Sequence, residues 1–188
     1  MSKVKKIKVD YSDTIIPAYD NADSGKIGRW IEEDLKQRNF PIDTAATVDM
    51  PVFGVEVKSR RIDSNAAHTV GGMTLRDIID THYDQSPIKQ KMQQQFRVSY
   101  DANRRVVVDA SVVDYSAEDV QQKIKSAYEA ARSKANPEHS GDLKGNEFGY
   151  FEDKGNGTYA FRIPNSGMKK LTSMAQSEQQ FQRFFDTA

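Results

Sequence analysis

Apolar side chains recur at helical spacing in five stretches of this chain. The clearest stretch runs over residues 24–38, where Ile27, Ile31 and Leu35 fall on one face of a helix. Pro41 follows this stretch and ends it. A second signal is Ser86-Pro87, which suits the cap and first turn of a helix. The predicted helices span residues 24–38, 74–83, 86–94, 116–134 and 172–185.

Other stretches carry alternating or β-branched residues, which is typical of strands. The predicted strands span residues 3–9, 52–58, 96–100, 105–113, 148–151 and 158–163. Turns at residues 101–104 and 153–157 join two pairs of them, while Gly71-Gly72 predicts a flexible turn and residues 135–146 a surface loop. This mixed order predicts an α/β to mixed α+β fold, with a central mixed sheet flanked by helices, in a single domain over residues 1–188.

Composition narrows the classes of protein that fit this chain. It carries 27 basic and 27 acidic residues, so the net charge is zero and any nucleic-acid site must be a local patch. The chain has no cysteine, which excludes a disulfide framework, a thiolate zinc site and a thiol nucleophile. No apolar run approaches the roughly 20 residues of a membrane span, and the charged N-terminal stretch lacks the apolar core of a signal peptide. We therefore expect a soluble, cytoplasmic protein that does not bind membranes.

One short stretch combines residue types that suit phosphodiester chemistry. Asp49 precedes the predicted strand that holds Glu56, Val57 and Lys58. Positions two apart on a strand share a face, so Glu56 and Lys58 point together, Val57 points into the core, and Gly54 leaves room on the charged face. If Asp49 curls back beside Glu56, the two carboxylates form a hard oxygen site suited to Mg²⁺, with Mn²⁺ as a substitute. The ammonium of Lys58 can then orient and activate a water for attack on phosphorus.

The neighbouring charges fit the same chemistry. Glu32 follows Gly28 by four residues in the first predicted helix, and the missing side chain of Gly28 lets that helix approach the sheet and bring Glu32 towards Asp49 and Glu56. Basic residues come directly after the predicted metal strand, and carboxylates flanked by bases are the charge pattern of a nuclease. The simpler interpretation is a half-exposed strand that alternates charged residues with valines, preceded by a solvated acidic run on the helix.

These residues resemble the MutH-like branch of the PD-(D/E)XK nucleases. The stretch Asp49-Met-Pro-Val-Phe-Gly-Val-Glu56-Val-Lys58 is similar to that branch's Asp-x6-Glu-x-Lys pattern, including its proline and Gly-Val pair. Residues 25–32 resemble its helix with an additional active-site glutamate. The resemblance implies a restriction-endonuclease-like fold and a Mg²⁺-dependent endonuclease that acts on double-stranded DNA. It implies catalytic roles for Glu32, Asp49, Glu56 and Lys58, with Asp49 and Glu56 as the metal ligands.

The resemblance also suggests which residues bind DNA. Residues 88–91 are similar to a family segment with a further functional lysine, so we expect Lys89 and Lys91, together with Arg60, to contact phosphates near the cut bond. Residues 157–164 are similar to a late stretch near which an arginine reads bases. Arg162 would then read guanine in the major groove, and cleavage would be selective for a sequence or structure. The alternative is that Arg162 pairs with an acidic neighbour such as Asp153.

Other interpretations stay open. Residues 181–185 lack the aromatic-Leu-Lys-Lys pattern of the family, so neither base preference nor an interaction with the repair partner MutL follows, and a homodimer is left open. Asp43 with Glu56-Val-Lys-Ser-Arg60 resembles archaeal Holliday-junction resolvases, although Asp49 also accounts for Pro51 and Gly54. A DNA-binding or scaffolding domain without chemistry would use Arg60 and its neighbour Arg61, and would bind DNA without a divalent metal.

Overall fold

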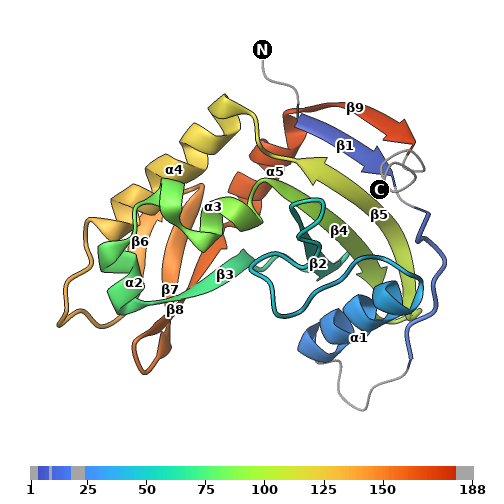
Figure 1. Cartoon of the computed structure of the whole chain (residues 1–188), viewed down its shortest axis with the longest axis horizontal. Helices are drawn as coiled ribbons and strands as arrows, with labels where there is room; N and C mark the ends of the chain where they lie inside the picture. The colour runs from blue at the N-terminus through green and yellow to red at the C-terminus, as the bar shows by residue number, and fades with distance from the viewer. Residues whose placement is uncertain (1–3, 9, 18–23, 181–188) are drawn as a thin grey trace. The chain divides into compact units, whose positions relative to one another are not determined.

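The computed structural model describes residues 4–8, 10–17 and 24–180, which contain both helices and strands (Figure 1). The mixed α+β class is therefore confirmed. The described strands form two sheets, in the orders β2-β4-β5-β1-β9 and β3-β8-β7-β6, so the expectation of one central sheet is wrong. No helix of the described residues is long and apolar enough to cross a membrane.

The chain clusters into two compact units, each with one of the sheets. The first, which we call the five-stranded unit, comprises the described residues within 4–64, 93–114 and 175–180. The second, the four-stranded unit, comprises Asn65–Met92 and Tyr115–Met174. The single domain expected over residues 1–188 stays a prediction.

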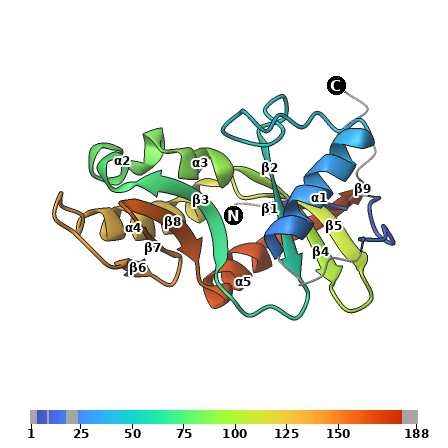
Figure 2. The same cartoon turned by 90° about the horizontal axis from the view of Figure 1, so that it is seen from below.

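The five-stranded unit carries its helix on one face of its sheet (Figure 2). Its elements are β1 (Val4–Lys8), α1 (Ser24–Gln37), β2 (Val55–Arg61), β4 (Gln94–Asp101), β5 (Val106–Asp114) and β9 (Ala175–Gln180). Strand β2 lies at one edge and pairs with β4 in parallel, whereas β4 and β5 are antiparallel. The apolar face predicted for the first helix packs on the sheet, where Ile27, Ile31 and Leu35 share a core with Val57 and Phe96.

The four-stranded unit is built around aromatic side chains. Its elements are β3 (His68–Thr74), α2 (Leu75–Asp80), the 3₁₀ helix η1 (Tyr83–Gln85), α3 (Pro87–Lys91), α4 (Glu118–Arg132), β6 (Leu143–Asn146), β7 (Gly149–Gly155), β8 (Thr158–Ile163) and α5 (Asn165–Ser173). Tyr128 of α4 stacks edge-on against Tyr83 and Phe151, with ring centroids 5.5 and 5.4 Å apart. Such pairs add stability beyond the area that they bury.

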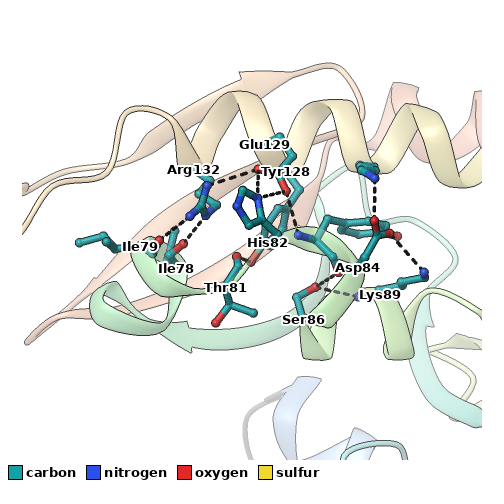
Figure 3. Close-up of polar contacts among 12 residues, drawn as sticks. Ile78, Ile79, Thr81, His82, Asp84, Ser86, Lys89, Tyr128, Glu129 and Arg132 are labelled. Carbon is teal, nitrogen blue, oxygen red and sulfur yellow. Dashed lines mark hydrogen bonds and ion pairs between the residues drawn. The ribbon is translucent and has the colours of Figure 1, made fainter.

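Polar side chains of α4 contact the end of α2 and the segment that follows it (Figure 3). Arg132 donates hydrogen bonds from Nε and Nη2 to the carbonyl oxygens of Ile78 and Ile79, at 3.0 and 2.6 Å. Glu129 accepts a hydrogen bond of 2.9 Å from the backbone N–H of Tyr83. Carbonyl groups at a helix end lack partners within the helix, so Arg132 caps α2. The helix predicted over residues 74–83 consequently stops at Asp80.

Two short strands replace segments that were predicted to be irregular. Strand β3 includes Gly71 and Gly72, where a flexible turn was expected. A Cβ atom at Gly71 would lie 2.8 Å from Cδ of Lys91, so glycine here makes room for the lysine stem. Strand β6 lies within the predicted loop 135–146 and pairs with β7. Strands that contain glycine carry little local β signal, which explains both errors.

Two predicted helices end early because their residues join a sheet. The helix predicted over residues 86–94 has the expected Ser86 cap, yet it ends at Lys91 because Gln94–Asp101 pairs with both β2 and β5. The helix predicted over residues 172–185 is wrong at residues 175–180, which form β9 and pair in parallel with β1. Helix α5 precedes β9, and residues 181–185 lie outside the described residues. Tertiary pairing overrides helical spacing in both places.

Candidate active site on strand β2

The candidate site begins with a tight turn between Asp49 and Glu56. Met50 and Val55 form an antiparallel bridge with backbone hydrogen bonds of 2.8 and 3.1 Å. Gly54 has a φ of 65° within this turn, so it shapes the turn and is not the expected spacer on the charged face of β2. Since residue 50 pairs with residue 55, continuing the register outward puts Asp49 across from Glu56. The six residues between the two acids therefore form the turn that sets Asp49 across from Glu56.

The carboxylate of Asp49 lies against the outer edge of β2. Its Oδ2 atom accepts a hydrogen bond of 2.8 Å from the backbone N–H of Val57. Strand β2 pairs with β4 along its other edge, so Asp49 occupies the side that β4 does not cover. The N–H and C=O groups of one strand residue point to the same edge, so the carbonyl oxygen of Val57 faces the same side as Asp49. Asp49 and the Val57 carbonyl thus bring oxygen atoms to one edge.

Glu56 and Lys58 form an ion pair on one face of β2. Lys58 Nζ lies 2.9 Å from Glu56 Oε1, and the two side chains are 28% and 3% exposed. Val55 and Val57 are buried on the opposite face, as the alternation along the strand predicts. Among residues 10–17 and 25–174, whose burial the structure describes, Glu56 is the one charged residue that is buried. A buried carboxylate is costly unless it is paired, so Lys58 stabilises the charge of Glu56.

Helix α1 approaches β2 from the other face of the sheet. A Cβ atom at Gly28 would lie 3.2 Å from Oγ of Ser59, so the absent side chain permits a close approach, as predicted. Glu32 follows Gly28 by one helical turn on the same side of α1 and is half-buried, whereas Glu33 is exposed. Ser59 shares the face of Val57 and not that of Glu56. Helix α1 therefore packs on the face of β2 opposite to the ion pair, and the expected convergence of Glu32 with Asp49 and Glu56 stays a prediction.

Asp43 is the alternative to Asp49 as the acid that would act with Glu56, and its carboxylate is hydrogen-bonded within its own loop. Its Oδ1 atom accepts a hydrogen bond of 3.0 Å from the backbone N–H of Ala45. The backbone N–H of Asp43 donates to the carbonyl oxygen of Asp49 at 2.7 Å. Asp43 thus shapes the loop that leads into Asp49, while Asp49 itself reaches β2.

The basic residues at the end of β2 contact the loop that follows the strand. Arg60 donates a hydrogen bond of 3.0 Å from Nη2 to the carbonyl oxygen of Ser64. Arg61 forms an ion pair of 2.9 Å with Asp63, and the hydrogen bond between them raises the pKa of Arg61 and lowers that of Asp63. The patch of Arg60 and Arg61 is therefore held in place by local contacts.

Three other residues predicted to bind DNA belong to the four-stranded unit. Lys89 pairs with Asp84 at 3.2 Å, and Lys125 pairs with the same carboxylate at 2.7 Å. The hydrogen bonds from Lys125 and Lys89 lower the pKa of Asp84. The aliphatic stem of Lys91 packs against Gly71.

Arg162, the third of these residues, pairs with an acid across the hairpin of β7 and β8. Its Nη1 atom lies 2.6 Å from Oε2 of Glu152, and its Nη2 atom donates to the carbonyl oxygen of Ala67 at 2.7 Å. The hydrogen bond from Arg162 lowers the pKa of Glu152. Arg162 therefore forms the ion pair expected with an acidic neighbour, and that neighbour is Glu152 rather than Asp153. Asp153 instead accepts hydrogen bonds from the backbone N–H groups of Gly155 and Gly141.

The oxygen atoms on β2 suit a hard cation in their chemistry. Asp49 and Glu56 supply carboxylates, and Val57 supplies a carbonyl oxygen on the side of Asp49. Mg²⁺ is commonly held by one or two carboxylates, with water and phosphate oxygens completing its shell. The described part of the chain contains no group of three or more His, Cys, Asp or Glu residues arranged to hold a metal ion. The donor set is thus two carboxylates and one backbone carbonyl.

Comparison of the chain with protein-family models and with curated proteins gives no match. The evidence for a function consequently comes from the geometry around β2.

Proposed function

We propose that this protein is a Mg²⁺-dependent DNA endonuclease whose five-stranded unit has a restriction-endonuclease-like fold. The observation that carries the proposal is the 2.8 Å hydrogen bond from the Val57 N–H to Asp49, which fixes a second carboxylate at the edge of the strand that carries the Glu56–Lys58 pair. One strand thus carries an acid and a lysine, and a second acid is bonded to its backbone. A mixed sheet with this strand at its edge and α1 on one face supports the proposed fold.

The residues have separate roles in this proposal. Asp49, Glu56 and the Val57 carbonyl would hold the ion, which when bound neutralises charge on the phosphate and polarises its oxygen atoms. Lys58 is fixed by Glu56 and is 28% exposed, so its ammonium group can donate a hydrogen bond to the attacking water. Glu32 would order the site from the opposite face of β2.

Double-stranded DNA is the proposed substrate, and cleavage is proposed to be selective. Arg60, Lys89 and Lys91 would contact phosphates, and Arg162 would contact a base. Lys89 and Arg162 would have to leave Asp84 and Glu152 to do so, because each is paired with its acid. The contact of Asp49 with β2 favours the MutH-like arrangement over one with Asp43 as the metal ligand.

The test is cleavage of supercoiled plasmid and of a random-sequence duplex library. We expect cutting or nicking with Mg²⁺ or Mn²⁺, none with EDTA, and a loss of at least about 100-fold in Glu56→Gln and Lys58→Met. Glu32→Gln and Glu33→Gln form a matched pair on neighbouring positions of α1, and only the first should slow cleavage. Sequencing of the library ends reports any base preference and strand geometry.

Two results would contradict this proposal. Undiminished cleavage by the Glu56→Gln or Lys58→Met variant would show that the chemistry lies elsewhere. DNA binding that is equally strong in EDTA, without cleavage under any divalent metal, would favour the non-catalytic DNA-binding domain.

A further inference from the structure

The turn that precedes β2 has an apolar corner. The backbone N–H of Phe53 donates to the carbonyl oxygen of Met50 at 3.1 Å, so these residues are the ends of a β-turn. Pro51 and Val52 are its two central residues, and the ring of proline fixes φ near the value that the first of these positions needs. The N–H of Gly54 donates to the Pro51 carbonyl oxygen at 3.2 Å. Backbone hydrogen bonds therefore hold the corner in place.

Both corner residues are exposed to water. Val52 is 73% exposed, and it is one of four exposed large apolar side chains in the part of the chain whose burial the structure describes. Pro51 is exposed as well. A partner that covered them would gain from the burial of apolar surface, and the fixed backbone would lose little conformational entropy. A single exposed valine is common on protein surfaces, so its location decides whether it has a role.

The location of the corner is beside the proposed metal ligand Asp49. Val52 follows Asp49 by three residues, and consecutive Cα atoms are about 3.8 Å apart, so their Cα atoms lie within about 11 Å of each other. A DNA duplex rises about 3.4 Å per nucleotide, so this distance equals about three nucleotide steps. A duplex whose cut phosphate lies at Asp49 would therefore pass close to Pro51 and Val52.

We propose that Pro51 and Val52 form a substrate-positioning corner that packs against the deoxyribose groups next to the cut bond. This inference rests on the proposed endonuclease function and adds an apolar contact to it. One DNA strand alternates charged phosphates with the apolar C–H faces of its sugars, so a metal ligand and an apolar corner three residues apart fit neighbouring groups of that strand. Contacts with sugars carry no sequence information, so the corner adds affinity for all sequences alike.

Ile15 provides a matched control within the five-stranded unit. It is 75% exposed, which is close to the value for Val52. It forms a bridge with Val106, which pairs with Asp101 at the last position of β4. Val55, at the start of β2, pairs with the first residue of β4. Strand β4 has 8 residues with a rise of about 3.3 Å each, so Ile15 lies about 23 Å along the sheet from the start of β2.

The first test adds a positive charge at each of these two positions. Affinity for a short duplex is measured over a salt series with Ca²⁺ in place of Mg²⁺. Val52→Lys should bind about 3- to 10-fold more tightly at low salt and raise the salt slope by about one unit, because the new ammonium group would reach a phosphate beside the corner. Ile15→Lys adds the same charge far from the site and should change neither.

The second test removes the apolar side chain without adding charge. Val52→Ser should raise the KM for cleavage about 3- to 10-fold and leave kcat and the salt slope unchanged. The loss should be the same for every sequence in the duplex library. Ile15→Ser should behave as wild type. Urea unfolding checks that the variants keep wild-type stability, as expected for exposed positions, and Val52→Ala replaces Val52→Ser if the latter fails to fold.

The outcomes separate the two proposals. Cleavage by wild-type protein, with KM unchanged in Val52→Ser or with Val52→Lys no different from Ile15→Lys, would overturn the role of the corner and leave the endonuclease standing. Binding without cleavage under any divalent metal, tighter in Val52→Lys and weaker in Val52→Ser, would overturn the endonuclease and retain the corner as a DNA contact. An absence of DNA binding would overturn both.

Discussion

Asp49 accepts a hydrogen bond from the backbone N–H of Val57, and this contact places its carboxylate at the uncovered edge of β2. The contact depends on a backbone bridge between Met50 and Val55 that reverses the chain. Asp49 thus supports the turn through this hydrogen bond, and in the proposed function its charge also binds the metal ion. Substitutions can separate these two roles, because the amide oxygen of asparagine can also accept a hydrogen bond but carries no charge.

Asp49→Asn and Asp49→Ala should differ in stability and agree in activity. Both should lose at least about 100-fold in DNA cleavage because both remove the carboxylate. Only Asp49→Ala leaves the Val57 N–H without its acceptor, which should lower the free energy of unfolding by about 1–3 kcal/mol. Urea unfolding and plasmid cleavage are the measurements. Equal stability of the two variants would show that the hydrogen bond does not support the turn.

Lys58→Met should destabilise the protein, and adding Glu56→Gln should restore part of the loss. The single change leaves the enclosed Glu56 carboxylate without its ion pair, which should cost about 1–3 kcal/mol because Lys58 itself is partly exposed. The double variant removes the carboxylate charge as well. A double-mutant cycle by urea unfolding measures the coupling, with Lys36→Met on the exposed side of α1 as the control. Additive effects of the two substitutions would contradict the pairing.

Arg162→Gln should destabilise the protein more at neutral pH than in acid. The hydrogen bond from Arg162 lowers the pKa of Glu152 below its usual 4.5. A carboxyl group whose pKa is lower in the folded state contributes stability that is present above the unfolded pKa and lost as the pH falls through the folded one. The difference in unfolding free energy between wild type and variant should therefore shrink below about pH 4.5.

The same variant tests whether Arg162 reads DNA. Lys154→Gln is the matched control, since Lys154 contacts Glu152 from a more exposed position. If the difference in unfolding free energy between wild type and Arg162→Gln stays constant with pH, the ion pair of Arg162 with Glu152 is not the source of that difference. A changed base preference of cleavage in Arg162→Gln, and not in Lys154→Gln, would support base recognition.

Gly71→Ala and Gly72→Ala form a matched pair that tests Lys91. A Cβ atom at Gly71 would lie 2.8 Å from the flexible stem of Lys91, whereas at Gly72 the nearest contact is an ordinary 3.6 Å. Both variants should fold, and only Gly71→Ala should displace Lys91. If Lys91 contacts a phosphate, Gly71→Ala should weaken DNA binding several-fold, as measured by fluorescence anisotropy. Lys91→Ala with weak binding and Gly71→Ala with normal binding would show that Gly71 does not position the lysine.

Local periodicity was enough to predict the parts of the site that lie within one element. Alternation along β2 puts Val57 in the core and Glu56 with Lys58 on the other face, and this follows from strand geometry alone. Helical spacing likewise predicted the buried side of α1, on which Ile31 is fully enclosed. These features depend on residues within a few positions of one another, so the sequence by itself determined them.

The choice between Asp49 and Asp43 required the tertiary structure, because it depends on which backbone groups pair around Gly54. The pairing of β2 with β4 depends on a register between residues that are far apart in sequence. Strand β9 was predicted as helix for the same reason, since its pairing with β1 joins the two ends of the chain. Backbone hydrogen bonds between distant segments leave little trace in local periodicity, so only the folded chain decides them.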